Sequence, residues 1–132
     1  MRLRLIRRGA WRLYAVATET ECQLTAFLSF APSDSLAANK AQMLQRLAYI
    51  AENGPPRNTS ISHQIVEDIF QIEKGSIRAL YFYGIARRTL IFSHGFPKTS
   101  QKTKRADIDR AVACLKSYRK ARQDGTLIVP ED

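Results

Sequence analysis

The chain has 132 residues, of which 45% are hydrophobic and 25% charged, so it is long enough for one domain with a modest core, and the composition excludes a disordered protein. Its formal net charge is +9 and is unevenly spread, because residues 73–122 hold thirteen Lys or Arg against three Asp or Glu. Such a basic region indicates a polyanionic partner, and nucleic acid is the first expectation.

Residues 1–10 are interpreted as a basic arm ahead of the domain, either a frayed tail or a contact for nucleic acid. Arginines interrupt the apolar residues here, which excludes a signal peptide and a membrane span, and we expect a cytoplasmic protein. The only two cysteines, Cys22 and Cys114, lack the number and spacing of a metal site or a disulfide framework, so we expect buried thiols.

The first half of the domain, which we place at residues 11–122, is predicted to hold one strand and two helices. Alternation over Trp11–Thr18 predicts the strand. Helical spacing predicts a short helix or a single docked turn within Cys22–Phe30. It also predicts a longer helix over Ser35–Asn53, with one stripe that is apolar except for Lys40, and Gly54 and two prolines end this helix. We interpret both helices as cover for the core.

The second half is predicted to begin with three strands on short turns, which form an antiparallel meander. These strands are Ile69–Glu73, as the securest part of Ile65–Glu73, then Ser76–Tyr83 and Arg88–Ser93. Both faces of the middle strand carry apolar side chains, so alternation does not tell which face is open. A helix over Ala106–Arg122 follows, and residues 123–132 are interpreted as a tail.

Positive charge is densest over Arg87–Lys104, a stretch without an acidic residue. We interpret it as a short strand that ends in a loop holding His94 and three spaced lysines, Lys98, Lys102 and Lys104. A strand end aims its side chains rigidly, and the loop that follows is a common place for chemistry. The lysines are either a solvated loop or contacts for a phosphate backbone.

Catalysis by a bound metal is poorly supported, because His63 and His94 lie far apart and have no thiol or carboxylate at ligand spacing. We expect His63 to be an exposed loop residue. A triad of Ser93, His94 and Asp107 is disfavoured, because neighbouring side chains on a strand diverge. We therefore expect neither a metal nor a cofactor.

The remaining Arg, Lys, His and Tyr side chains suit metal-free cleavage of RNA, in which the ribose 2′-hydroxyl attacks the adjacent phosphate. A histidine can serve as base or acid, and cations hold the charge on the phosphorane. Arg78 is the first candidate for the phosphate, unless it is an edge-strand arginine with its head in solvent. For His94, a buried core histidine is an equally good interpretation. Tyr81 is interpreted as a core residue or as one that stacks on a base.

The order and spacing of motifs in the second half resemble the phage-derived branch of the RelE/HigB toxins. The matching segments are Phe70–Glu73 for an L-x-E-L-like strand end, Ile77–Tyr81 for Y-R-x-x-Y, His94–Thr103 for H-x-F-x-K-K-x-x-K-T, and Ile108–Tyr118 for I-x-x-A-x-x-x-L-x-x-Y. The N-terminal half fits as well, so the resemblance covers about residues 11–120. Ile77 departs from the pattern, where an aromatic is usual, and Lys98 lacks its paired lysine.

The resemblance implies an α+β protein with the RelE-like two-layer fold, in which a twisted, mainly antiparallel sheet of about four strands has helices packed on one side. It implies a toxin of a type II toxin–antitoxin pair that cuts messenger RNA without metal, typically on the ribosome. An antitoxin, often a helix-turn-helix protein, would hold it inactive. By motif, Arg78 would hold the scissile phosphate. His94, Lys98 and Lys102 would bind RNA or take part in proton transfer.

Beside these three catalytic candidates, we expect RNA-binding roles for Arg87, Arg88, Lys102, Lys104 and Tyr81. The competing hypothesis is a catalytically weak module of the same fold that holds RNA or a partner protein. RNA affinity with a steep salt dependence but without a cleaved product would distinguish it. A DNA-binding regulator is disfavoured, because no helix-turn-helix is evident.

Overall fold

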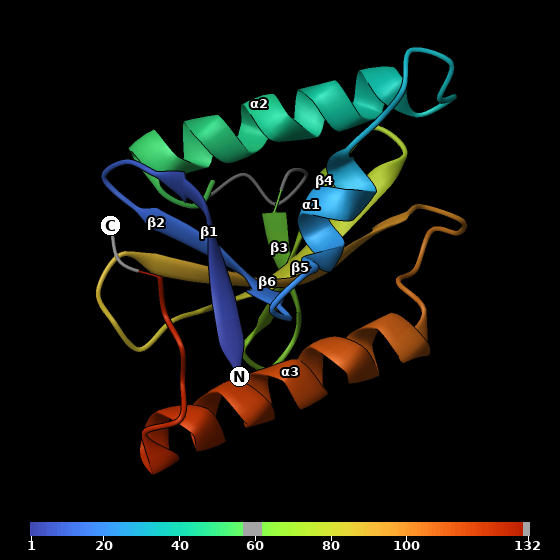
Figure 1. Ribbon diagram of the computed structural model, residues 1–132. Coiled ribbons are helices and arrows are strands. Elements are labelled where there is room, and N and C mark those ends of the chain that lie inside the picture. Colours follow the sequence, from blue (N-terminus) through green and yellow to red (C-terminus); the bar gives the residue numbers. More distant parts are fainter. Residues whose placement is uncertain (57–61, 131–132) are drawn as a thin grey trace.

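The computed structural model describes residues 1–56 and 62–130, which form a six-stranded sheet with helices on both faces (Figure 1). In chain order the elements are β1 (Arg2–Arg8), β2 (Arg12–Ala17), α1 (Gln23–Leu28), α2 (Ala37–Asn53), β3 (Ser62–Val66), β4 (Ile69–Lys74), β5 (Ile77–Tyr83), β6 (Thr89–Pro97) and α3 (Arg105–Asp124). Across the sheet the order is β1-β2-β6-β5-β4-β3. All neighbours are antiparallel except β2 and β6, which are parallel. Residues 57–61, which precede β3, lie outside the described residues.

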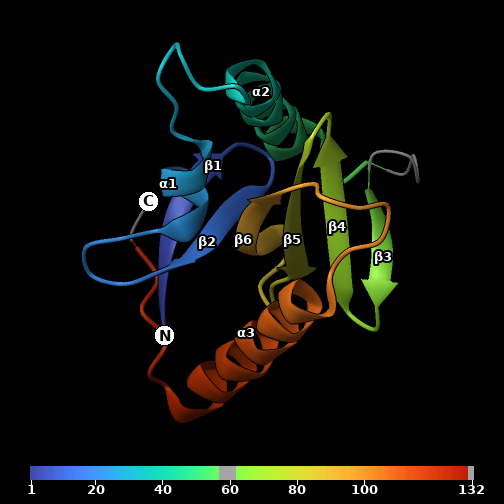
Figure 2. The same cartoon turned by 90° about the vertical axis from the view of Figure 1, so that its right-hand side faces the viewer.

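This sheet overturns the expected fold of about four strands with helices on one side. α1 and α2 cover one face, where Leu47 and Phe92 belong to one core, and α3 covers the other, where Leu80 and Leu115 belong to a second core (Figure 2). The cause lies in β5, whose apolar side chains point to both faces and must be buried on both. The broad α+β class holds, but the sheet is mixed and lies between two helical layers.

Two strands were not expected. In β1, Leu3 and Leu5 alternate with arginines and pack into the core beneath α3, while the strand pairs with β2 along its length. At the other edge, β3 pairs with β4, and Glu67 and Asp68 form the turn between them. The segment after α3 also joins β1, because the Leu3 N–H donates to the Ile128 carbonyl at 2.9 Å. The division into arm, domain and tail stays a prediction, but residues on both sides of it are tied to the sheet.

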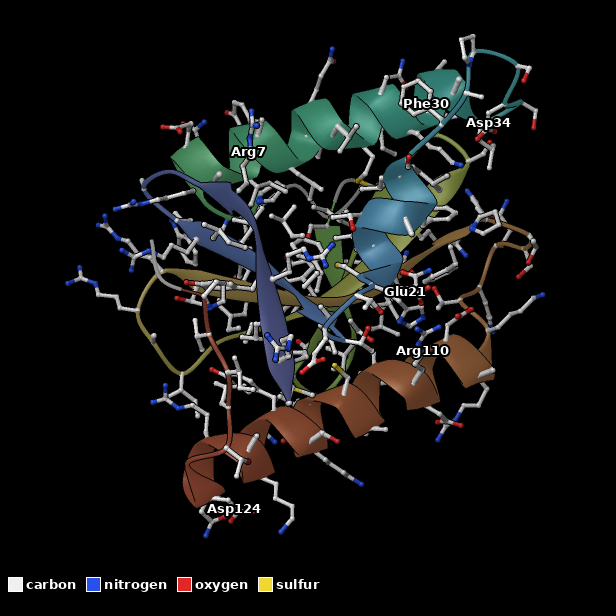
Figure 3. All side chains as sticks on the ribbon, viewed as in Figure 1. Arg7, Glu21, Phe30, Asp34, Arg110 and Asp124 are labelled. Carbon is white, nitrogen blue, oxygen red and sulfur yellow. The ribbon has the colours of Figure 1, made fainter. Side chains whose placement is uncertain are left out.

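The meander of β4, β5 and β6 agrees with the sequence, and each expected helix lies within two residues of its predicted bounds. Lys40, the one charge on the predicted apolar stripe of α2, is buried, and its Nζ donates to the Asp34 carboxylate at 2.6 Å (Figure 3 labels Asp34). None of the described helices is long and apolar enough to cross a membrane.

β6 extends past the end of β2, and α1 then becomes its neighbour. The Gln23 carboxamide pairs with the backbone of Gly95 in both directions, donating to its carbonyl at 2.7 Å and accepting its N–H at 2.8 Å. A Cβ at position 95 would stand 2.8 Å from the Phe27 ring, so the close approach of α1 requires glycine. α1 thereby fixes the end of β6, from which residues 98–104 lead to α3.

Candidate functional site

A cleft of about 360 Å³ opens on the α3 face of the sheet, between β3, β4, β5 and the loop 98–104. We call it the polar cleft; it is lined by His63, Ile65, Gln71, Glu73, Arg78, Lys98, Gln101, Lys102, Thr103 and Ile108. Figure 2 shows the loop passing across β5 and β4 before it returns to α3. Among residues 1–56 and 62–130, no three His, Cys, Asp or Glu side chains gather as metal ligands would.

Arg78 lies on β5, opposite Glu73 of β4 and Phe96 of β6. It is 3% exposed. Its Nε donates to Glu73 Oε1 at 3.2 Å, and its Nη2 donates to the Gln101 carbonyl at 2.7 Å. Arg78 is therefore on an inner strand with both ends of its guanidinium bound, which is how a buried cation is accommodated, and not an edge arginine in solvent.

Glu73 joins Arg78 on β5 to Lys98 on the loop 98–104, across the polar cleft. It was not among the site residues predicted from the sequence. Its Oε1 also accepts from Lys98 Nζ at 3.0 Å. Partial burial alone would raise the pKa of Glu73, but the hydrogen bond from Lys98 and the charge of Arg78 outweigh it and lower the pKa below its usual value. Glu73 is thus a carboxylate at neutral pH. The predicted strands leave Lys74 and Gly75 as the turn, whereas the turn lies at Gly75 and Ser76, and this register sets Glu73 opposite Arg78.

The loop 98–104 brings two of its three lysines to the polar cleft. Lys98 is fixed through its backbone, whose N–H donates to the Ser76 carbonyl at 2.7 Å, and Lys102 lines the cleft beside it. Thr103 holds the end of the loop by a hydrogen bond to Gln71. Lys104 caps the start of α3 and does not line the cleft. The structure therefore brings Arg78, Lys98 and Lys102 together.

The histidine of the polar cleft is His63. It was expected to be an exposed loop residue, but it lies on the edge strand β3, half-buried and opposite Gln71. An imidazole can both give and take a proton at neutral pH. His63 lines the polar cleft together with Arg78, Lys98 and Glu73, whereas His94, the histidine predicted for proton transfer, does not.

His94 lies outside the polar cleft. It is 1% exposed, with Nδ1 2.8 Å from Ser93 Oγ and Nε2 3.0 Å from Asp107 Oδ1. The prediction that Ser93 and His94 diverge is wrong, because a bulge in β6 opposite Leu80 and Tyr81 breaks the alternation there. We call Ser93, His94 and Asp107 the His94 network.

One protonation state satisfies the whole His94 network. A neutral imidazole with its proton on Nε2 donates to Asp107 and accepts at Nδ1 from the Ser93 hydroxyl. Burial lowers the pKa of His94, and the charge of Arg110 lowers it further. The hydrogen bond to Asp107 raises the pKa but does not outweigh burial, so the net shift is downward. His94 is thus neutral at pH 7 and ties β6 to the start of α3.

The remaining expected RNA-binding residues lie elsewhere. Tyr81 is in the core beneath α2, 1% exposed, with its hydroxyl 2.7 Å from Ser62 Oγ, and burial raises its pKa to about 12. Arg87 and Arg88 precede β6, whereas Lys98 follows it. The stretch expected as one basic surface is therefore divided between the two ends of a strand.

A family model described as phage-derived protein Gp49-like (DUF891) matches residues 34–116, which is more than half of the chain. The matched region runs from just before α2 through β3, β4, β5 and β6 into α3, and it contains every residue that lines the polar cleft. A comparison with curated proteins finds no match. The chain belongs to the phage-derived Gp49-like family.

Proposed function

We propose that this protein is the toxin of a type II toxin–antitoxin pair and that it cleaves messenger RNA in the polar cleft. The observation that carries the proposal is the meeting of Arg78 and Lys98 at one carboxylate, Glu73, beside His63. The Gp49-like family is a toxin-like family of toxin–antitoxin systems. The resemblance to RelE/HigB toxins supports an antitoxin partner and the ribosome as the place of cleavage.

In the proposed reaction a phosphate of the RNA takes the place between Arg78 and Lys98 that Glu73 occupies. The released Glu73 carboxylate accepts the proton of the ribose 2′-hydroxyl, whose oxygen then attacks the phosphorus. Arg78 and Lys98 hold the charge of the phosphorane. His63 gives a proton to the leaving 5′-oxygen. The products are a 2′,3′-cyclic phosphate and a free 5′-hydroxyl.

Lys98 is the partner that makes this exchange feasible. Its side chain is 32% exposed, whereas that of Arg78 is 4% exposed and held by Gln101 as well. The phosphate must still compete with Glu73 for both cations. An RNA fixed on the ribosome would compete better than free RNA, because its ordering entropy has already been lost.

The second candidate function is a binding module that holds RNA or a partner protein without cutting it. The ion pairs of Glu73 favour this candidate. Glu73 neutralises part of the charge of Arg78 and Lys98, so less of that charge is left to stabilise a phosphorane. The two candidates differ in one result: a binding module gives no cleaved product, with or without ribosomes.

The decisive experiment measures growth after induced expression and the ends of messenger RNA cut by the purified protein on ribosomes. We expect growth arrest and 2′,3′-cyclic phosphate ends, and no cut where the scissile nucleotide lacks its 2′-hydroxyl. Arg78→Lys keeps the positive charge but loses the bidentate guanidinium, and it should abolish most of the growth arrest and most of the cleavage. Full toxicity of the variant, or cleavage of the 2′-deoxy substrate, would contradict the mechanism.

The proposed antitoxin partner has its own test. If a short helix-turn-helix gene lies beside this one, its co-expression should restore growth and the two proteins should purify together. Rescue without a complex, or a complex without rescue, would contradict an antitoxin role for that gene.

A further inference from the structure

A second concentration of positive charge lies at the other end of β6 from the polar cleft. Arg87 and Arg88 end the connection from β5, and Arg8 and Arg12 flank the turn of the β1–β2 hairpin. The Arg12 N–H donates to the Arg88 carbonyl at 2.9 Å, and Arg8 pairs opposite Arg12. All four side chains are exposed. We call them the arginine cluster.

Three members of the arginine cluster, Arg12, Arg87 and Arg88, line a hollow of about 340 Å³ that Gly9 and Ala10 complete. One carboxylate approaches the hairpin turn, that of Glu52, whose Oε1 is 2.6 Å from where a Cβ on Gly9 would stand. Within the described residues no ion pair is seen for Arg87 or Arg88. Arg8 and Arg12 make contacts within the chain, whereas the exposed side chains of Arg87 and Arg88 are the two that a ligand can meet. Arg7 does not join them; Figure 3 labels it between β1 and α2.

The backbone of Arg88 is unusual for so large a residue. Its φ is 54°, in the left-handed region, which costs a side-chain-bearing residue of the order of 1 kcal/mol and suits glycine. The turn therefore holds an arginine where glycine would be more stable. The strained turn brings the side chain of Arg88 to the same hollow as that of Arg87. A ligand that binds both guanidinium groups would account for an arginine at this position.

The spacing of the two basic sites indicates what kind of ligand could reach both. Arg88 and Lys98 are ten residues apart along an extended strand, or roughly 30 Å at about 3.3 Å per residue. A single nucleotide cannot span this distance, whereas a duplex on the order of ten base pairs can. Arginine forks also match phosphate geometry. A ligand that reaches both sites would therefore be a chain of regularly spaced phosphates.

We propose that the arginine cluster is a second RNA-backbone contact, so that one structured RNA reaches from the polar cleft to Arg87 and Arg88. The identity of the ligand as RNA rests on the proposed function. The contact itself does not require cleavage, because phosphate recognition at the arginine cluster involves none of the residues assigned to proton transfer. The two proposals can therefore fail separately.

The test measures binding of uncleavable 2′-O-methyl RNA to the Arg87→Ala/Arg88→Gly variant, by fluorescence anisotropy for a hairpin of about twenty base pairs and by NMR titration for a tetranucleotide. We expect affinity for the hairpin to fall at least about tenfold, and the slope of log K against log salt to fall by about two. Tetranucleotide binding at the polar cleft should not change. Because glycine suits the turn, thermal stability should be equal or higher.

The matched control is Lys116→Ala/Arg122→Ala, which removes two exposed charges from α3. An equal loss of hairpin affinity in the control would mean general electrostatic attraction and overturn the proposal. Unchanged hairpin binding by the Arg87→Ala/Arg88→Gly variant would also overturn it. Binding of a polyglutamate peptide is measured in parallel, and a loss confined to that peptide would overturn the RNA contact and assign the cluster to an acidic protein. If unmodified RNA is never cut but the length-dependent loss is found, the proposed function fails and this inference stands.

Discussion

The polar cleft and the His94 network lie on the same face of the sheet and use the same kinds of side chain, but they differ in burial. In the cleft, Lys98, His63 and Glu73 are all partly exposed. In the network, His94 is fully buried and both ring nitrogens have partners. A group that completes its bonds inside the protein stabilises the fold, whereas an accessible one can meet a substrate. The environment, and not the residue type, separates the two histidines.

Replacing His63 gives the largest expected effect and the sharpest test of this comparison. If His63 protonates the leaving oxygen, His63→Gln should lower the cleavage rate about 1,000-fold, as for the loss of a general acid. The free energy of unfolding should change little, because the side chain lies half-buried on an edge strand. Single-turnover cleavage on ribosomes and urea unfolding measure the two quantities. A variant that cleaves at the full rate would remove His63 from the mechanism.

Lys98→Ala should lower the cleavage rate about 100-fold, because one of the two cations on the phosphorane is lost. Stability should fall by less than about 1 kcal/mol, since its ion pair with Glu73 is partly exposed. Lys104→Ala is the matched control, because Lys104 belongs to the same loop but lies outside the polar cleft. Equal losses of rate in both variants would mean that the loop acts through its net charge, and the distinction between cleft and surroundings would fail.

Much of the fold could be predicted from local patterns. The meander of β4, β5 and β6 follows from three apolar runs on short turns, and the apolar stripe of α2 is found as expected. β1 was missed because its arginines were given more weight than their alternation with Leu3 and Leu5, which is a strand pattern. The second helical layer was missed although β5 is apolar on both faces. A local pattern does not say where a helix distant in sequence will pack.

The candidate site was predictable in part. The motif order placed Arg78 and Lys98 at one site, and the structure brings them to the same cleft. Glu73 was missed because the predicted strands leave Lys74 and Gly75 as the turn, a register that sets Gln71 opposite Arg78. The turn lies one residue later, and Glu73 is therefore the residue opposite Arg78. The sequence could not have predicted that His63, and not His94, lines the polar cleft. This placement depends on a bulge in β6 and on the path of β3 along the sheet edge, and tertiary packing determines both.

His94→Asn tests the other side of the comparison. The shorter amide cannot bond both Ser93 and Asp107, so at least one buried polar group loses its partner, at a cost of about 2 kcal/mol in the free energy of unfolding. The cleavage rate per folded molecule should stay within a few-fold of the parent value. Urea unfolding and single-turnover cleavage below the unfolding transition measure both. A large loss of rate in a fully folded variant would mean that His94 takes part in the chemistry after all.

The smallest expected effect is a pH dependence of stability that belongs to His94 alone. Burial lowers its pKa in the folded protein below the usual value of 6.5, against the opposing bond to Asp107. As pH falls through about 6.5, the unfolded chain therefore binds a proton that the folded protein does not, and stability decreases until the folded pKa is passed. Glu73, whose pKa is lowered from 4.5, loses its contribution only at more acidic pH. Urea unfolding of the parent between pH 8 and pH 5.5 should show this decrease, and His94→Asn should flatten it. A parent that gains stability over this range would mean that the Asp107 carboxylate outweighs burial and that His94 is an imidazolium in the folded protein.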